Sequence, residues 1–310
     1  MLSFRSINQQ FDLHRWLLPL CGWFIVIAWL PRALAAEDRG KDRIWLIDTR
    51  SSLSSECEDC KLREVSVCEV ATESSPQLTP SQLATQFSPQ RTLLFFVHGN
   101  RIPPERAVER GLAVHQMLVK DSPAPFDLVL WSWPSAKIRR PLIDVREKAA
   151  RTQREACLLS KFISTVDSRV RLRMIGYSFG SRIITGALHR LHRKKEKVQR
   201  DIRGVLLAAA LSHDWLEPKR QHAGAMHQLD RMLLFVNPCD PVLRRFRVIS
   251  GRGYALGYVG LPSDTKLGPL LKKVQSHDVQ NEVGRSHSLL RYLDAPGITQ
   301  LIRSHVFNGK

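Results

Sequence analysis

Short apolar runs alternate with longer amphipathic patterns over most of this 310-residue chain. Each run has the length of a strand and is rich in Val, Ile, Leu and Phe, as expected for strands buried on both faces of a parallel sheet. The intervening patterns repeat at helical spacing, and one of them begins at Pro103-Pro104, where proline favours a helix start. The predicted strands are the segments 91–99, 126–135, 170–177, 202–210 and 231–241.

The alternation extends over about 215 residues, from Arg91 to His305, and predicts the fold class. Strands that alternate with helices form a doubly wound α/β structure with a mainly parallel sheet. Ligands of such sheets bind outside the carboxyl ends of the strands. The segment His98-Gly99-Asn100, Ser178 and Asp240 all lie at the carboxyl ends of predicted strands, so we expect a site where they meet.

Residues 36–90 differ in pattern from the rest. Two strand-like runs, DRIWLID and REVSVCEV, are followed by a polar stretch from Thr72 to Gln90 that is rich in Ser, Thr, Gln and Pro. We expect an N-terminal β-containing segment, either a hairpin or a small subdomain, and a linker into a main domain spanning 91–310.

Three cysteines, Cys57, Cys60 and Cys68, cluster in this N-terminal segment. A local disulfide between two of them fits an exported protein. The CEDC stretch could instead form half of a zinc site, but no second Cys or His pair follows at finger-like spacing. No H-E-x-x-H or comparable ligand cluster occurs either, so we expect no metal and no cofactor.

Residues 1–35 have the pattern of a secretory signal. Basic residues precede the apolar run 16–30, and the small residues ALA at 33–35 suggest cleavage after Ala35. The run is short for a membrane span, although Arg32 is unusual at its place and an uncleaved anchor is the alternative. We therefore expect an exported, periplasmic or extracellular protein.

The formal net charge is +18, and removal of residues 1–35 would leave +16. Such a charge attracts anionic surfaces, but no nucleic-acid-binding motif accompanies it. The densest basic run, HRLHRKKEKVQR at 189–200, follows the helix after Ser178 and fits a solvated helix end. Arg139, Arg140, Lys219 and Arg220 lie in two further loops, where they either favour an anionic substrate or are solvated surface charge.

The stretch GYSFG places Ser178 between Gly176 and Gly180, after a strand and before a helix. A nucleophile elbow requires this context, because the serine sits in a sharp turn that exposes its hydroxyl. The flanking glycines let the strand and the helix approach closely. A Gly-rich connection without chemistry is the alternative interpretation.

Through these and four further motifs, the chain resembles the α/β-hydrolase superfamily from Arg91 to His305. The resemblance rests on FFVHGN, WSWPS, GYSFG, NPCDPVL and RSHSLL, and on the chain order Ser, Asp, His. The set is most similar to a bacterial subgroup with V-H-G-x-N and W-P-S motifs. Tyr177 departs from that subgroup, many members of which have His before the serine.

The resemblance implies roles for these residues. Ser178 would be the nucleophile, His287 the base and Asp240 the orienting acid. The backbone N–H groups of Asn100 and Phe179 would form the oxyanion hole, and Gly99, Gly176 and Gly180 would shape the loop and the elbow.

Other residues compete for two of the roles. Asp214 also follows a strand-like run, but in this fold the acid usually follows the second strand after the nucleophile, which favours Asp240. His277 lies among polar residues and His305 near the end of the chain, whereas His287 directly precedes the apolar SLLRYL in an expected strand-to-helix loop.

The sequence therefore predicts a serine hydrolase that forms an acyl-serine on a carboxylester or related acyl substrate, either a small molecule or a lipid-like one. The competing hypothesis is a non-catalytic scaffold of the same fold, held at an anionic envelope surface by its positive charge. The pattern says nothing about the oligomeric state.

Overall fold

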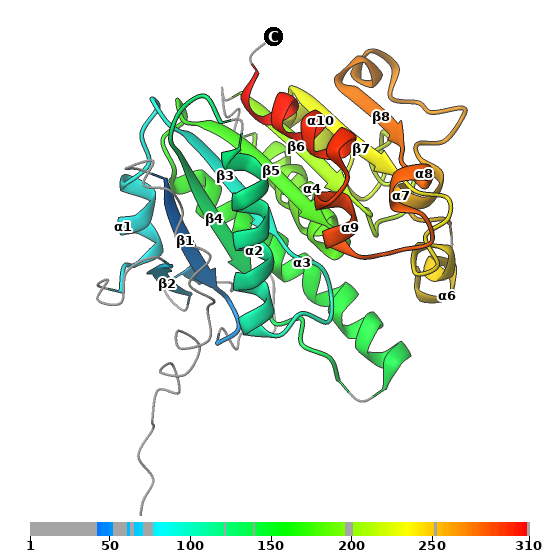
Figure 1. Ribbon diagram of the computed structural model, residues 1–310, viewed down its shortest axis with the longest axis horizontal. Helices are drawn as coiled ribbons and strands as arrows, with labels where there is room; N and C mark the ends of the chain where they lie inside the picture. The colour runs from blue at the N-terminus through cyan, green and yellow to red at the C-terminus, as the bar shows by residue number, and fades with distance from the viewer. Residues whose placement is uncertain are drawn as a thin grey trace, which may run out of the picture. The chain divides into compact units, whose positions relative to one another are not determined.

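An eight-stranded sheet forms the centre of the computed structural model (Figure 1). The structure describes residues 42–51, 61–62, 65–70, 77–120, 122–138, 140–195, 201–250 and 253–308. The strand order is β2-β1-β4-β3-β5-β6-β7-β8. The strands are β1 (Arg43–Asp48), β2 (Ser66–Glu69), β3 (Thr92–Val97), β4 (Phe126–Ser132), β5 (Arg171–Tyr177), β6 (Ile202–Leu207), β7 (Arg231–Val236) and β8 (Val274–Asp278).

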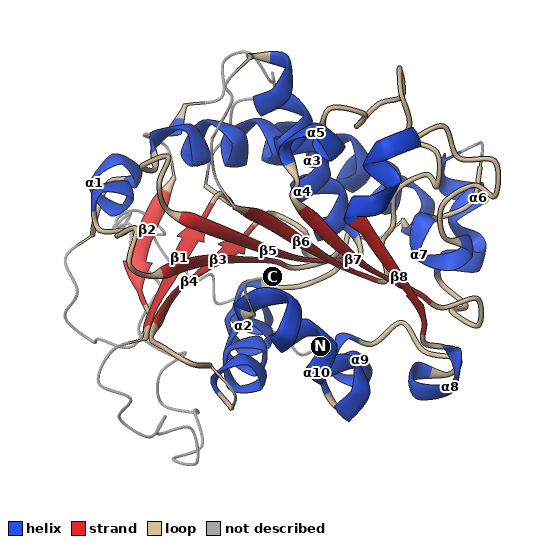
Figure 2. Ribbon diagram, turned by 90° about the horizontal axis from the view of Figure 1, so that it is seen from above, coloured by secondary structure: helices blue, strands red, loops and turns tan. Residues whose placement is uncertain are grey.

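Helices pack on both faces of this sheet (Figure 2). One face carries α1 (Pro80–Thr85), α3 (Pro141–Thr165), α4 (Phe179–Arg193) and α5 (Ala225–Gln228), and the other carries α2 (Pro104–Val119), α9 (Leu289–Leu293) and α10 (Pro296–Phe307). Shorter elements connect the last strands: η4 (Leu243–Arg245), α6 (Phe246–Ser250), α7 (Leu256–Val259), η5 (Gly268–Lys273) and α8 (Gln280–Val283).

All neighbouring strands from β1 to β8 pair in parallel, and only β2 runs antiparallel to its neighbour β1. The predicted doubly wound, mainly parallel sheet is thus confirmed. β3 and β5 are neighbours in the sheet. The connection after β3 leads to β4 on one side of this pair, and the connection after β5 leads to β6 on the opposite side. The loops after β3 and β5 therefore leave the sheet side by side at a topological switch point, where ligands of such sheets bind.

The N-terminal strands belong to the main sheet and do not form a subdomain of their own. β1 pairs with β4 over its whole length, from Arg43 opposite Asp127 to Asp48 opposite Ser132. The buried carboxylate of Asp127 accepts hydrogen bonds from Arg43 at 2.7 Å and from Arg91 at 3.1 Å, which ties β1, β3 and β4 together. β1 and β2 thus form an antiparallel hairpin at the edge of the main sheet.

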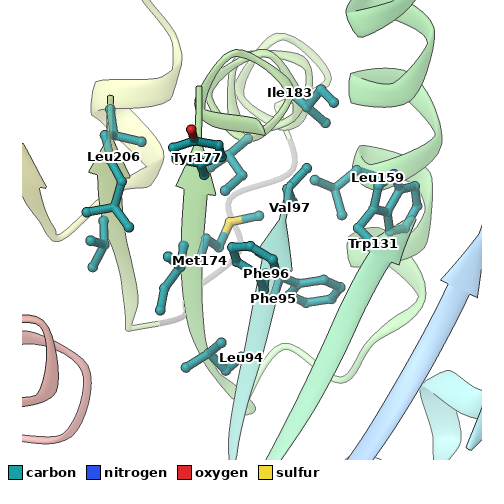
Figure 3. Packing of buried hydrophobic residues seen from close by; sticks show 14 of the residues in the cluster. Leu94, Phe95, Phe96, Val97, Trp131, Leu159, Met174, Tyr177, Ile183 and Leu206 are labelled. Atoms are coloured by element: carbon teal, nitrogen blue, oxygen red, sulfur yellow. The ribbon is translucent and has the colours of Figure 1, made fainter. Parts of the chain in front are cut away.

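Aromatic side chains fix the central strands against α3 (Figure 3). The ring of Phe162 on α3 packs edge-on against Phe95, with 6.0 Å between centroids, and lies 6.4 Å from the ring of Trp131. All three side chains are fully buried. Since burial of such large apolar surfaces stabilises a core by a few kcal/mol per side chain, β3 and β4 present their carboxyl ends from a rigid base.

Several sequence predictions fall outside the described residues. These are the signal segment 1–35 and its cleavage site, and the positions of Cys57 and Cys60, so the local disulfide stays a prediction. Cys68 lies on β2 and forms no disulfide with any described residue. Within the described ranges, no helix is long and apolar enough to cross a membrane.

Candidate active site

Ser178 forms a sharp turn between β5 and α4. Its backbone angles are φ 54° and ψ −116°, a conformation that is costly for a residue with a side chain. Glycines on both sides make the turn sterically feasible. A Cβ atom at Gly180 would lie 1.9 Å from the carbonyl oxygen of Val97, and one at Gly176 would lie 2.6 Å from Cα of Ser181. The elbow expected from GYSFG is present.

A hydrogen-bonded chain of three side chains starts at this serine. His287 Nε2 lies 3.1 Å from the Ser178 hydroxyl, and His287 Nδ1 lies 2.6 Å from a carboxylate oxygen of Asp240. At these distances Nδ1 can donate to the carboxylate while Nε2 accepts from the serine hydroxyl. The three predicted residues therefore lie in hydrogen-bonding order, although they are far apart in the sequence.

The carboxylate of Asp240 is held in place by backbone donors. Asp240 is fully buried, and its second oxygen accepts hydrogen bonds from the N–H groups of Val242 at 2.8 Å and Leu243 at 3.0 Å. These bonds leave the first oxygen directed at the imidazole of His287. Since a buried carboxylate is strongly stabilised by such donors, Asp240 is fixed in orientation before any substrate binds.

Two further side chains hold His287 in position, and neither was given a role from the sequence. The side-chain amide of Asn237 donates to the carbonyl of Gly284 at 2.9 Å and accepts from the N–H of Cys239 at 3.0 Å, so it joins the His287 loop to the Asp240 loop. The hydroxyl of Tyr177 donates to the carbonyl oxygen of His287 itself. Burial raises the pKa of Tyr177, so this donor keeps its proton at any ordinary pH.

The predicted oxyanion donors lie in the adjoining loop and helix. Phe179 begins α4, and Asn100 follows β3 after Gly99, whose added Cβ would lie 3.0 Å from Cβ of Ser178. Neither the N–H of Asn100 nor that of Phe179 donates to another group within the described part of the chain. Two backbone donors next to Ser178 therefore remain available, and the positive end of the α4 dipole adds to one of them.

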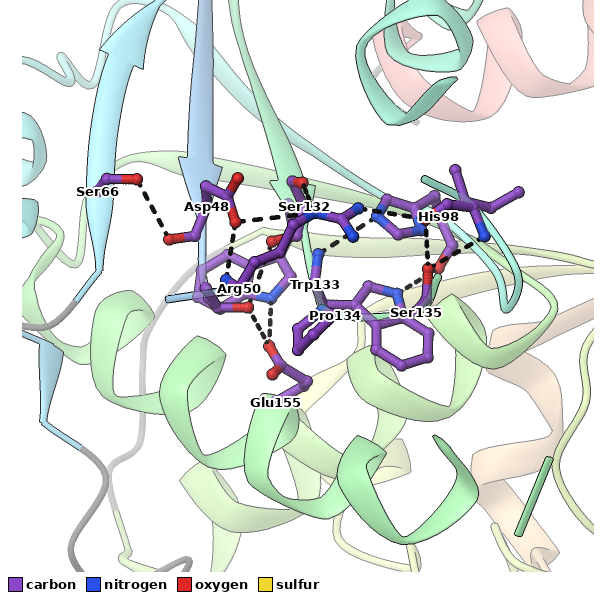
Figure 4. A network of polar contacts seen from close by, with 12 residues as sticks. Asp48, Arg50, Ser66, His98, Ser132, Trp133, Pro134, Ser135 and Glu155 are labelled. Carbon is purple, nitrogen blue, oxygen red and sulfur yellow. Dashed lines mark hydrogen bonds and ion pairs between the residues drawn. The ribbon is translucent and has the colours of Figure 1, made fainter. Parts of the chain in front are cut away.

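The Trp-Pro-Ser end of β4 holds this loop in position (Figure 4). The hydroxyl of Ser135 donates to the carbonyl of Ile102 at 2.9 Å, and its backbone carbonyl accepts from the N–H of Arg101 at 2.8 Å. The indole of Trp133 stacks on His98, with 5.8 Å between ring centroids, and donates to the His98 carbonyl at 2.9 Å. The WSWPS and VHGN motifs are thus one hydrogen-bonded unit.

His98 serves this unit as a neutral brace. Its Nδ1 donates to the carbonyl of Gly99 at 2.9 Å, and its Nε2 accepts from the N–H of Trp133 at 3.3 Å. Complete burial lowers the pKa of His98 to about 3. The ring therefore carries no charge near neutral pH, and both of its nitrogens are hydrogen-bonded, one to Gly99 and one to Trp133.

Comparison with known protein families identifies the family of the chain. A family model described as an alpha/beta hydrolase of unknown function (DUF900) matches residues 77–305. The chain belongs to this α/β-hydrolase family. No curated protein matches the chain significantly.

Two solved structures are also similar to the chain. A protein named as a cell surface hydrolase from Lactobacillus plantarum shares 12% identity, covering 71% of this chain and 93% of its own, with a TM-score of 0.39. A point mutant of tomato methylketone synthase I shares 11% identity, covering 69% of this chain and 96% of its own, with a TM-score of 0.32.

The competing residues of this α/β hydrolase lie elsewhere. Asp214 accepts from the hydroxyl of Ser212 at 2.7 Å and pairs with Arg220 at 3.3 Å. His277 lies on β8 against the ring of Phe235, and His305 lies in α10. One expectation was wrong in detail, because the loop that carries His287 connects α8 to α9 and not a strand to a helix. In the ranges that the structure describes, no group of three or more His, Cys, Asp or Glu side chains is arranged to hold a metal.

Proposed function

We propose that the protein is a serine hydrolase that cleaves a carboxylester or related acyl substrate through an acyl-serine intermediate. The observation that supports this most directly is the hydrogen-bonded order Ser178, His287, Asp240 at a strained elbow. Strain of this kind persists where function requires it, because the surrounding structure must offset its cost. Membership in an α/β-hydrolase family supports a hydrolase in general.

In the proposed reaction, the Ser178 hydroxyl attacks the acyl carbon while its proton passes to Nε2 of His287. Asp240 stabilises the imidazolium that forms, and the N–H groups of Asn100 and Phe179 stabilise the oxyanion. His287 then gives the proton to the leaving alcohol, and an acyl-serine remains. Water, activated by the same imidazole, releases the acid and restores the serine.

Covalent labelling tests this proposal. We expect a fluorophosphonate probe to label the full-length protein, and we expect the label to be lost in Ser178→Ala. An equivalent change at Ser304, which is exposed on α10, is the matched control and should leave labelling intact. Undiminished labelling of Ser178→Ala would remove this serine from the mechanism. No labelling of folded wild-type protein would favour the non-catalytic scaffold.

The proposal includes two further points. We infer that the substrate is a small or lipid-like acyl compound, because the chemistry of the site requires only an acyl carbon and a leaving group.

The secretory pattern of residues 1–35 supports export of the enzyme. N-terminal sequencing checks the second point, since a mature chain that starts at Ala36 or Glu37 is expected and an intact Met1 on a membrane-bound form would contradict it.

A further inference from the structure

A hollow of about 460 Å³ lies where the C-terminal end of α4 meets the segment leading into α5. Two stretches that are well separated in the sequence, 189–193 and 218–227, form its walls. No Asp or Glu is among its lining residues in the part of the chain that the structure describes. The lining side chains that carry or can acquire positive charge are His189, His192, Arg193, Lys219, Arg220 and His227.

Gly224 allows the second stretch to pack tightly on the helix end. A Cβ atom at this position would lie 2.8 Å from Cδ2 of His192 and 3.0 Å from Nδ1 of His189. The N–H of Gly224 donates to that same Nδ1 at 3.0 Å, so a neutral His189 carries its proton on Nε2. The His192 and His227 rings stack, with 4.6 Å between centroids and 14° between planes. The basic side chains are therefore gathered by specific packing.

Positive charge in this hollow is only partly compensated. Arg220 pairs with Asp214 at 3.3 Å, but that arginine is mostly exposed, so the pair contributes little. No salt bridge is found for Arg193 or Lys219 with any described carboxylate. The C-terminal end of a helix dipole attracts cations, but a dipole alone does not explain why a second basic segment converges on the same end.

Burial and cationic neighbours lower the pKa values of histidines at the hollow. Partial burial, followed by the charges of α4, lowers the pKa of His189; those charges belong to Arg193, His192 and Arg190. Partial burial also lowers the pKa of His227, and the facing groups there are His192 and Lys273. Behind them, His222 is buried and hydrogen-bonded to Thr185, and burial lowers its pKa well below the ordinary value. Among the described residues, none of the charged groups that shift these three pKa values is an anion, so the shifts reflect burial and neighbouring positive charge.

We propose that this hollow binds the phosphate group of an anionic ligand. Arg, Lys and imidazole N–H donors bind phosphate oxygens through charge-assisted hydrogen bonds. The volume lies in the range of small-molecule sites, so a phosphate together with part of its carrier fits. The carrier is either a soluble compound or a lipid headgroup, since both present the same phosphate.

The proposed phosphate site is distinct from the catalytic serine. Ser178 precedes the first residue of α4, and the hollow lies at the other end of this 15-residue helix. At 1.5 Å per residue the separation is about 20 Å along the helix. Binding in the hollow therefore does not depend on the proposed hydrolase reaction, and each proposal can fail without the other.

Calorimetric titration of the full-length protein with pyrophosphate at physiological salt tests the site. Wild type should bind, and Arg193→Gln/Lys219→Gln should lose about tenfold or more in affinity. Arg106→Gln/Arg146→Gln removes the same charge from exposed positions on α2 and α3 and is the matched control. Equal losses of affinity in the two double variants would mean diffuse electrostatic attraction and would overturn the proposal. It would also be overturned if wild type bound neither pyrophosphate nor the vesicles described next.

Two further arms complete the test. Gly224→Ala keeps every charge but displaces the packed segment, so it should weaken binding while circular dichroism stays unchanged; undiminished affinity would overturn the assignment of the site. Vesicles containing phosphatidylglycerol are the second probe. Binding to these vesicles alone, lost in Arg193→Gln/Lys219→Gln, identifies the phosphate as a lipid headgroup, whereas binding to pyrophosphate identifies a soluble ligand.

The pH dependence of binding depends on His227. A bound phosphate favours a protonated imidazole, so binding takes up a proton at His227, whose pKa is lowered in the free protein. Because phosphate groups themselves gain a proton near about pH 6, the effect is measured against His227→Gln, and the affinity of wild type relative to this variant should rise several-fold from pH 8 to pH 5.5. A ratio that stays constant over this range would exclude His227 from the site.

Discussion

At the scale of single residues, the site depends on how its side chains are oriented. Asp240 is surrounded by three donors, two from the backbone and one from His287, and so has a single direction available to it. Asp214 has different partners, Ser212 and Arg220, which hold it in another network. Two aspartates with similar sequence surroundings therefore differ in what they can do.

This difference gives the first prediction. On folded variants assayed with a short-chain ester, His287→Ala or Asp240→Asn should lower kcat a thousandfold or more, because the base or its correct tautomer is lost. His277→Ala and Asp214→Asn should stay within about tenfold of wild type, since neither side chain contacts the serine. The reverse pattern would overturn the assignment of acid and base while leaving Ser178 as the nucleophile.

The second prediction concerns the backbone donor at Asn100. The side-chain oxygen of Asn100 is buried without a hydrogen-bond partner among the described residues, so Asn100→Ala should change kcat little. Asn100→Pro deletes the N–H and should lower kcat by roughly a hundredfold or more. Steady-state kinetics of the two variants side by side makes the comparison, and a fully active proline variant would show that the oxyanion is held by another donor.

At the scale of elements, the contact between α4 and β3 decides whether the elbow can form. An added Cβ at Gly180 would lie 1.9 Å from the Val97 carbonyl, so Gly180→Ala must push α4 away from the sheet. We expect a loss of about 3 kcal/mol in the free energy of unfolding, measured with denaturant. Gly297→Ala on α10 is the control, because nothing lies within 4 Å of that position, and it should be neutral or stabilising. Equal stabilities would contradict the close approach.

The same scale shows what the sequence could predict. Strands β3 to β7 and the elbow could be predicted from the sequence, because apolar runs and helical periodicity are local signals. The pairing of β1 with β4 is not, since strand partners are chosen by contacts between distant segments. Likewise, Asn237 and Tyr177 act on residues 47 and 110 positions away, and no local pattern records such bonds. Short elements such as α5 and α8 also lack a full period to read.

At the scale of the whole molecule, one buried carboxyl group links the N-terminal strand to the core (Figure 4). Glu155 on α3 accepts hydrogen bonds from Thr49, which follows β1, at 2.8 Å and from the indole of Trp131 on β4 at 3.1 Å. Its other oxygen is buried without a hydrogen-bond partner among the described residues. Burial raises the pKa of Glu155 from 4.5 to about 7 despite the two donors.

The stability of the protein should therefore depend on pH through this group. Below pH 4.5 the carboxyl is protonated in both the folded and the unfolded chain. Between pH 4.5 and 7 it ionises first in the unfolded chain, so the free energy of unfolding should fall by roughly 3 kcal/mol as the pH rises and then level off. Glu155→Gln keeps an acceptor for Thr49 and Trp131 but cannot ionise. The free energy of unfolding, measured with denaturant from pH 5 to pH 8, should fall steadily in wild type relative to Glu155→Gln. Parallel curves would mean that Glu155 keeps an ordinary pKa in the folded protein.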